Sequence, residues 1–126
     1  MHALFVDDEV EFLQLMEKRL SRRGRTIVTA PDGQSALDIV TEAMKQPETM
    51  FQVVVMDVRM PGMDGLETLR HMKKIAPKLP VLLLTGHASL GVAVQGMDLG
   101  AYDYMLKPVA INELIIKMEE AVRAAA

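Results

Sequence analysis

Five short runs of mostly apolar, β-prone residues alternate along the chain with longer segments of helical character. The runs lie at residues 3–6, 26–30, 53–57, 81–85 and 101–106. Residues 53–56 and 81–84 are apolar at every position, which is typical of strands that are covered on both faces of a parallel sheet. The pattern therefore predicts five strands, with residues 53–57 as the central one.

Apolar residues in the intervening segments recur every three or four positions, as on the buried face of an amphipathic helix. These segments lie at residues 11–23, 34–45, 66–75, 90–99 and 111–122. Helix-ending residues follow four of them, namely Gly24, Pro47, Pro77 and Gly100. Because strands and helices alternate five times with short connections, we predict an α/β fold with a single doubly wound, five-stranded parallel sheet and five helices.

The composition suits one domain and narrows the classes of function. The 126 residues, 50% of them hydrophobic, are enough for one core, so we expect a single domain over residues 1–126. The net charge of −3 gives no reason to expect direct nucleic-acid binding, and no apolar run approaches the roughly 18 residues of a membrane helix. With no cysteine and no signal-peptide pattern after Met1, we expect a cytoplasmic protein.

Polar residues stand where four of the predicted strands end. They are Asp7 and Asp8 after the first strand, Asp57 at the end of the third, Thr85 at the end of the fourth and Lys107 after the fifth. Because the carboxyl ends of parallel strands meet at one edge of a sheet, we expect these side chains to converge there.

The convergence indicates a particular chemistry. Clustered carboxylates raise one another's pKa unless a cation lies among them, and Mg²⁺ is a cation that prefers oxygen ligands, so we expect Mg²⁺ at Asp7, Asp8 and Asp57. Lys107 and Thr85 would supply an ammonium and a hydroxyl to phosphoryl oxygens. Asp57 is then a carboxylate nucleophile of the kind that forms aspartyl phosphates.

Four segments, in this order, resemble a known family. They are residues 6–9 (VDDE), 56–65 (MDVRMPGMDG), 84–87 (LTGH) and 102–108 (YDYMLKP). Each segment alone is weak evidence for a family, but all four together, at successive strand ends, are specific evidence. The whole chain resembles a response-regulator receiver domain of the CheY-like superfamily. It is most similar to receivers of the NtrC type. The resemblance implies a flavodoxin-like fold with strand order 2-1-3-4-5.

The resemblance also implies residue roles. Asp57 is the expected phosphoacceptor, and Asp7, Asp8, Asp57 and the backbone carbonyl of Arg59 are the expected Mg²⁺ ligands. Lys107 matches the lysine of the family motif. We therefore expect a signalling protein that catalyses its own phosphorylation and dephosphorylation, and not an enzyme with other substrates.

Two residues match the switch of the family. Thr85 is the hydroxyl expected to contact the phosphoryl group, and Tyr104 is the aromatic residue expected to turn inward when Thr85 moves. The face formed by the fourth helix, fifth strand and fifth helix should then change shape. The Lys107-Pro108 peptide bond is expected to be cis, an isomer that is accessible before proline.

The resemblance gives the partners by class, within a two-component system. The expected phosphodonor is a sensor histidine kinase or a phosphotransfer protein. The expected output is an ATPase or DNA-binding domain beyond Ala126 that regulates transcription. Residues 90–99 hold more apolar side chains than one buried stripe needs, so a homodimer through this face is a further expectation.

Other interpretations stay open at this point. Asp8 or Glu9 could cap the following helix, and Tyr104 could be a core residue. His87 could shape access to the site or lie exposed, and the Arg59 side chain could gate the site or lie in solvent.

Three other functional classes compete with phosphotransfer signalling. A pseudo-receiver binds partners without phosphorylation, but it typically lacks an acid or the lysine, all of which are present here. An aspartyl phosphatase usually has a second Asp two residues after the nucleophile, where this chain has Arg59. A flavin-binding module of the flavodoxin type would need strand-end aromatic residues and a Ser/Thr-rich phosphate loop, which the sequence lacks.

Overall fold

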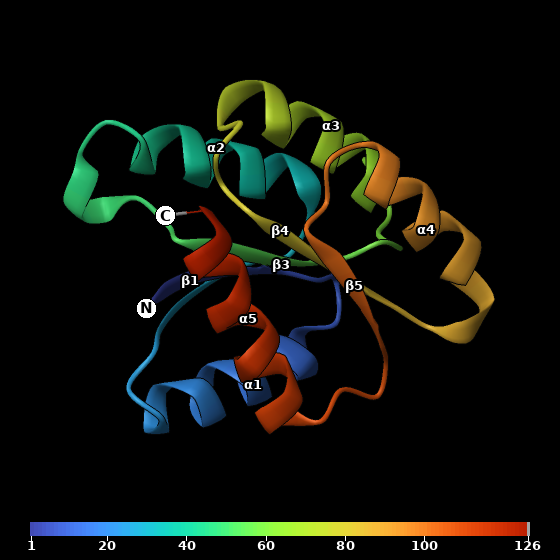
Figure 1. Cartoon of the computed structure of the whole chain (residues 1–126), viewed down its shortest axis with the longest axis horizontal. Helices are drawn as coiled ribbons and strands as arrows, with labels where there is room; N and C mark the ends of the chain where they lie inside the picture. Colours follow the sequence, from blue (N-terminus) through green and yellow to red (C-terminus); the bar gives the residue numbers. More distant parts are fainter. Residues whose placement is uncertain (126) are drawn as a thin grey trace.

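The computed structural model describes residues 1–125. Five parallel strands form one sheet in the order β2-β1-β3-β4-β5, which confirms the predicted topology (Figure 1). The strands are β1 (His2–Val6), β2 (Thr26–Ala30), β3 (Val53–Asp57), β4 (Val81–Thr85) and β5 (Asp103–Leu106). β3 lies at the centre and is buried along its whole length, as its unbroken apolar run predicts.

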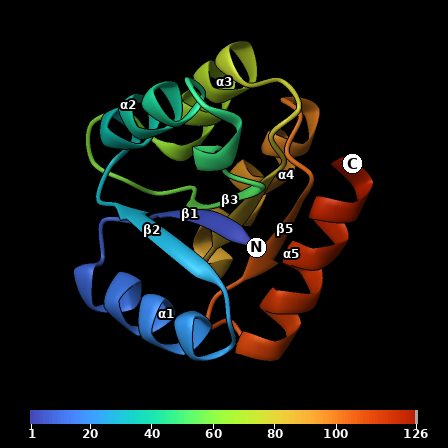
Figure 2. The ribbon, with the colours of Figure 1, turned by 90° about the vertical axis from the view of Figure 1, so that its left-hand side faces the viewer.

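Helices cover both faces of the sheet. They are α1 (Val10–Arg22), α2 (Gly33–Ala43), α3 (Gly65–Ile75), α4 (Leu90–Asp98) and α5 (Ile111–Ala125), with short 3₁₀ turns η1 (Pro47–Thr49) and η2 (His87–Ser89). α1 and α5 pack on one face, and α2, α3 and α4 pack on the other (Figure 2). Each helix within residues 1–125 is too short or too polar to cross a membrane.

Successive residues of the inner strands enter two separate cores. In β1, Leu4 and Val6 face the core under α2, α3 and α4, whereas Ala3 and Phe5 face the core under α1 and α5. Side chains alternate between the two faces of a strand, so both sets must be apolar when helices cover both faces. Polar side chains are therefore displaced to the strand ends.

Several element boundaries differ from the sequence prediction by one to three residues, and two of these differences lie next to the strand ends that carry polar residues. β5 begins at Asp103 and not at residue 101, because the Ala101 amide still donates to the Gly96 carbonyl in α4. α1 begins at Val10, and the N-cap residue Glu9 makes no side-chain capping bond. The sequence left helix capping open for Asp8 and Glu9; the N-cap position falls on Glu9, and its side chain does not cap the helix.

Gly65 holds the loop after Asp57 in place by a close contact. Its amide donates to the Val58 carbonyl at 3.0 Å, which brings the start of α3 against the end of β3. A β-carbon at Gly65 would lie 2.6 Å from the Asp57 carbonyl oxygen and 2.6 Å from the Val58 α-carbon, closer than van der Waals contact allows. Glycine is needed here for space, and its fit fixes the backbone that carries Asp57.

Gly65→Ala is expected to lower the free energy of unfolding by about 1–3 kcal/mol, because the methyl group would overpack against main-chain atoms. Gly91→Ala is the matched control, since a β-carbon at Gly91 meets nothing within 4 Å. Removing a helical glycine at such a site should stabilise the protein by about 0.5 kcal/mol. Urea denaturation measures both variants, and equal stability of the two would show that the Gly65 contact is dispensable.

Candidate functional site

Three charged side chains meet at the carboxyl edge of the sheet. Asp7 follows β1, Asp57 ends β3, and Lys107 follows β5. β1 and β3 are paired strands, so the two aspartates are neighbours at their ends. The Lys107 amide donates to the Thr85 carbonyl at the end of β4, at 2.8 Å, which ties the lysine backbone to the same edge. Strand order alone thus brings together residues that are distant in sequence.

The Lys107 ammonium joins the carboxylates. Its Nζ donates to Asp7 Oδ2 at 2.7 Å and to Asp57 Oδ2 at 3.1 Å, and it lies 3.4 Å from Glu9 Oε1. Asp7 is 1% exposed and Asp57 is 7% exposed, while the Lys107 side chain is 18% exposed. The bonds to Asp7 and Asp57 are charge-assisted and largely shielded from water, so they are stronger than an ion pair on the surface.

The two buried aspartates use their other oxygen to shape the loops that follow them. Asp7 Oδ1 accepts from the Glu9 amide at 2.9 Å, and Asp57 Oδ1 accepts from the Arg59 amide at 3.0 Å. Each bond reaches the backbone two residues further on, which is the Asx-turn pattern. With Oδ1 engaged in this way, Oδ2 of each aspartate is left for Lys107.

Burial and pairing act in opposite directions on the charged groups. Burial raises the pKa of Asp7 above its usual value, and the hydrogen bond from Lys107 opposes this only in part. Burial acts to lower the pKa of Lys107, but hydrogen bonds to Asp7 and Asp57 outweigh it, and that pKa is raised. One ammonium bonds to both buried carboxylates, and Lys107 stays protonated at neutral pH.

Asp8 completes a group of acids that suits a hard metal ion. One carboxylate oxygen from each of Asp7, Asp8 and Asp57 lies within 4.8 Å of the others. Asp8 is exposed while the other two are buried, so the group is open to water on one side. An all-oxygen donor set with access for water is the kind that Mg²⁺ binds. The residues therefore fit Mg²⁺, and such an ion would compete with Lys107 for the buried carboxylates.

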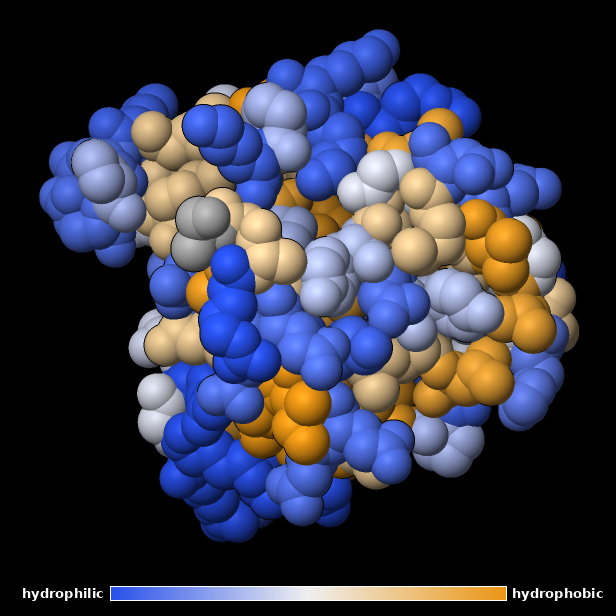
Figure 3. Space-filling view, viewed as in Figure 1, coloured by the Kyte–Doolittle hydropathy of each residue, from blue (hydrophilic) through white to orange (hydrophobic). Residues whose placement is uncertain are grey.

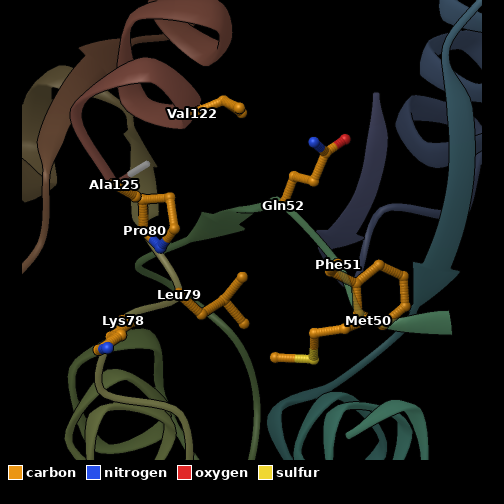
Figure 4. A pocket seen from close by; sticks show the side chains of 8 residues that line it. All are labelled: Met50, Phe51, Gln52, Lys78, Leu79, Pro80, Val122 and Ala125. Carbon is orange, nitrogen blue, oxygen red and sulfur yellow. The ribbon is translucent and has the colours of Figure 1, made fainter. Parts of the chain in front are cut away.

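A cleft of about 380 Å³ opens onto this group of acids. Its lining comes from the loops after β1, β3 and β4 and from the residue after β5: Asp8, Glu9, Asp57, Arg59, Gly86, Ala88, Ser89 and Lys107. A second hollow lies at the opposite edge of the sheet, where mostly apolar side chains surround it (Figure 4). Its lining includes no strand-end acid, so the first cleft is the candidate site.

The expected switch residues lie on the strands next to the cluster. Thr85 is fully buried at the end of β4, and its hydroxyl donates to the Gly86 carbonyl at 2.9 Å. Tyr104 on β5 is half-buried and packs against the core under α2, α3 and α4. The Lys107-Pro108 peptide bond is cis, as expected.

Four further positions at the site were left open or missed by sequence reasoning. The side chains of Arg59 and His87 are exposed, although the Arg59 amide bonds to Asp57. Ser89 is buried and lines the cleft, and the ring centroid of Phe12 lies 4.5 Å from Lys107 Nζ. The helical spacing of residues 11–23 marked Phe12 only as part of an apolar stripe, and it carried no signal of this contact.

Comparison with known proteins gives consistent matches. The model of the response regulator receiver domain family matches residues 3–119. Response regulator MprA of Mycolicibacterium vanbaalenii is 38% identical over 123 residues, which cover 98% of this chain and 51% of that protein. The DNA-binding transcriptional regulator NtrC of Klebsiella pneumoniae is 37% identical over 120 residues, which cover 95% of this chain and 24% of that protein. The chain thus spans about half the length of MprA and about a quarter of the length of NtrC.

Solved structures of similar sequence share the fold over almost the whole chain. A response regulator receiver domain protein from Clostridium thermocellum has a TM-score of 0.89 and 35% identity, covering 98% of this chain and 94% of that one. The receiver domain of NtrX from Brucella abortus has a TM-score of 0.86 and 35% identity, covering 96% of this chain and 98% of that one.

Lys107→Met is expected to lower the free energy of unfolding at pH 7 by about 2–4 kcal/mol, because it leaves the buried carboxylates without their cation. Without that cation the pKa of Asp7 rises further, so the folded variant binds more protons than its unfolded chain. Its stability should therefore increase as pH falls from 7 towards the usual aspartate value of 3.8, and its deficit should narrow.

Urea denaturation of this variant across that pH range makes the measurement. Lys18→Met, at an exposed position of α1, is the control and should change stability by less than about 0.5 kcal/mol. A deficit for Lys107→Met that stays constant with pH would contradict the electrostatic role of the lysine.

Proposed function

This chain belongs to the response regulator receiver domain family, and on that premise we propose that Asp57 accepts a phosphoryl group from a sensor histidine kinase or a phosphotransfer protein. It is a receiver domain of a two-component system and thus a signalling protein. The observation that carries the proposal is the contact of one ammonium, on Lys107, with buried carboxylates from two other strand ends, Asp7 and Asp57.

The proposed transfer uses the carboxylate as a nucleophile. One oxygen of Asp57 attacks phosphorus and forms a P–O bond, while the P–N bond of the donor phosphohistidine breaks. The electron pair of that bond stays on the imidazole nitrogen, which takes a proton from water. Asp57 stands at the end of a rigid central strand, and the bond from the Arg59 amide fixes its rotamer, so the acceptor oxygen is already oriented.

Charge neutralisation is the main task of the surrounding residues. A Mg²⁺ ion held by Asp7, Asp8, Asp57 and the backbone carbonyl of Arg59 would, when bound, neutralise the oxygens of the phosphoryl group. Lys107 turns from Asp7 to a phosphoryl oxygen, and this movement is short because Nζ already lies 3.1 Å from Asp57 Oδ2. The same groups assist hydrolysis of the acyl phosphate, so the domain catalyses both its phosphorylation and its dephosphorylation.

The phosphoryl group changes the surface through Thr85 and Tyr104. Rotation of the Thr85 hydroxyl from the Gly86 carbonyl to a phosphoryl oxygen opens space into which half-buried Tyr104 turns. The changed surface is the face of α4, β5 and α5. Its exposed large hydrophobic side chains are Val94, Met97, Leu106 and Ile116, and Figure 3 shows apolar atoms gathered over α4.

The output is proposed from the relatives. MprA and NtrC are longer than this chain, and NtrC is a DNA-binding transcriptional regulator. We assign residues 1–126 to the receiver domain, with an ATPase or DNA-binding output domain after it and a homodimer through the α4-β5-α5 face. An output on transcription acts where the DNA is, which supports a cytoplasmic location.

Asp57→Asn should abolish phosphorylation, because an amide lacks the nucleophilic oxygen. Incubation with acetyl phosphate and Mg²⁺ should attach one acid-stable, base-labile phosphoryl group to the wild-type protein, detected by mass spectrometry. Asp38→Asn, which replaces an exposed acid bonded to Gln34 on α2, is the control and should be labelled like the wild type. Labelling of Asp57→Asn at another residue would exclude Asp57 as the acceptor.

Asp8→Asn should weaken Mg²⁺ binding by about tenfold or more, because it removes a charged oxygen ligand while sparing the buried pair. Isothermal titration calorimetry of the unphosphorylated protein measures the affinity. Asp38→Asn again serves as the control of equal charge change, and it should bind Mg²⁺ as the wild type does. Equal affinities for all three proteins would place the ion elsewhere.

A further inference from the structure

Besides its carboxylates, the Lys107 ammonium contacts an aromatic ring. Nζ lies 4.5 Å from the centroid of the Phe12 ring, over its face. Phe12 stands in the first turns of α1, is half-buried and packs against the core under α1 and α5. Lys107 is therefore enclosed between acids of the strand ends and an aromatic ring that belongs to the helical layer.

The contact is attractive for a physical reason. The face of an aromatic ring carries partial negative charge, so it attracts a cation within about 6 Å, and the attraction grows when water is excluded. The Lys107 side chain is only 18% exposed, so little water competes with the ring. Unlike a carboxylate, the ring does this without binding protons or metal ions.

This property matters because both buried acids around Lys107 have a second task in the proposed reaction. Asp7, the acid closest to the ammonium at 2.7 Å, is also an expected Mg²⁺ ligand. Asp57 becomes an acyl phosphate and loses its own negative charge to the new bond. Glu9 is exposed and lies at 3.4 Å, so it holds the ammonium only weakly. The Phe12 ring, by contrast, keeps the same charge distribution whether or not a metal ion or a phosphoryl group is bound.

We infer that Phe12 is a positioning residue, whose ring keeps the Lys107 ammonium beside the acceptor while Asp7 and Asp57 change partners. The inference rests on the proposed function. It assigns no direct contact between Phe12 and the phosphoryl group, since the ring acts through the lysine. It also gives the aromatic ring a role beyond packing in the core, since an aliphatic side chain at position 12 could also pack there.

The inference predicts different effects of a Phe12 substitution on the phosphorylation rate and on the affinity for Mg²⁺. Phe12→Leu keeps an apolar side chain but removes the ring, so phosphorylation by acetyl phosphate at saturating Mg²⁺ should slow by about fivefold. The affinity for Mg²⁺ should stay the same or increase, because Lys107 then competes less strongly for Asp7. A residue that merely supports the fold would weaken both properties together. Phe51→Leu, at a buried phenylalanine at the opposite edge of the sheet, is the matched control and should change neither.

Fluorinated phenylalanines at position 12 separate electrostatics from packing. Successive fluorine atoms withdraw charge from the ring face with little change of size, so a cation–π contact weakens in steps while the core remains filled. The phosphorylation rate should fall stepwise from the unsubstituted to the trifluorinated ring. This series keeps the inference testable even if Phe12→Leu does not fold.

Three results would overturn the inference: an unchanged rate in Phe12→Leu, a loss of rate matched by an equal loss of Mg²⁺ affinity, or equal rates across the fluorinated series. Each presupposes that the wild-type protein is labelled by acetyl phosphate at Asp57. Absence of that labelling would instead overturn the proposed function, so the two failures are distinguishable.

Discussion

The ion cluster of Lys107 with Asp7 and Asp57 is the interaction on which the rest of the site depends. Parallel strands deliver two buried carboxylates to one edge of the sheet, where they would repel each other without a cation. Leaving such charges unpaired in the interior is far more costly than at the surface. The lysine after β5 supplies the cation. The edge strand β5 and the inner strands β1 and β3 must therefore all be in place before the cluster can form.

The same cluster is the basis of the two states in the proposed switch. Lys107 now occupies carboxylate oxygens that a metal ion and a phosphoryl group would also use, so binding at Asp57 requires an exchange of partners. A ligand shifts an equilibrium only through contacts that are better in one state. Thr85 and Tyr104 lie on β4 and β5, which lead from the cluster to the α4-β5-α5 face. The ring of Phe12 limits how far the ammonium moves during the exchange.

The fold and the site differ in how far the sequence predicts them. Burial on both faces of β3 leaves an unbroken apolar run, so the residue pattern is sufficient to predict a parallel sheet. The carboxyl ends of parallel strands share one edge, so the same pattern also predicts that Asp7, Asp57 and Lys107 meet there. The contact of Phe12 with Lys107 and the bond of the Thr85 hydroxyl to its own neighbour depend on rotamers and on the placement of α1 over the sheet. Residue spacing encodes neither, and the roles of the switch residues came from the family resemblance.

A crystal structure with Mg²⁺ and a phosphoryl mimic bound tests this arrangement most directly. The predicted result is a metal ion ligated by Asp7, Asp8 and Asp57, with Lys107 Nζ moved from Asp7 to an oxygen or fluorine of the mimic on Asp57. Lys107 still bonded to Asp7, with the mimic and the ion bound away from Asp57, would contradict it.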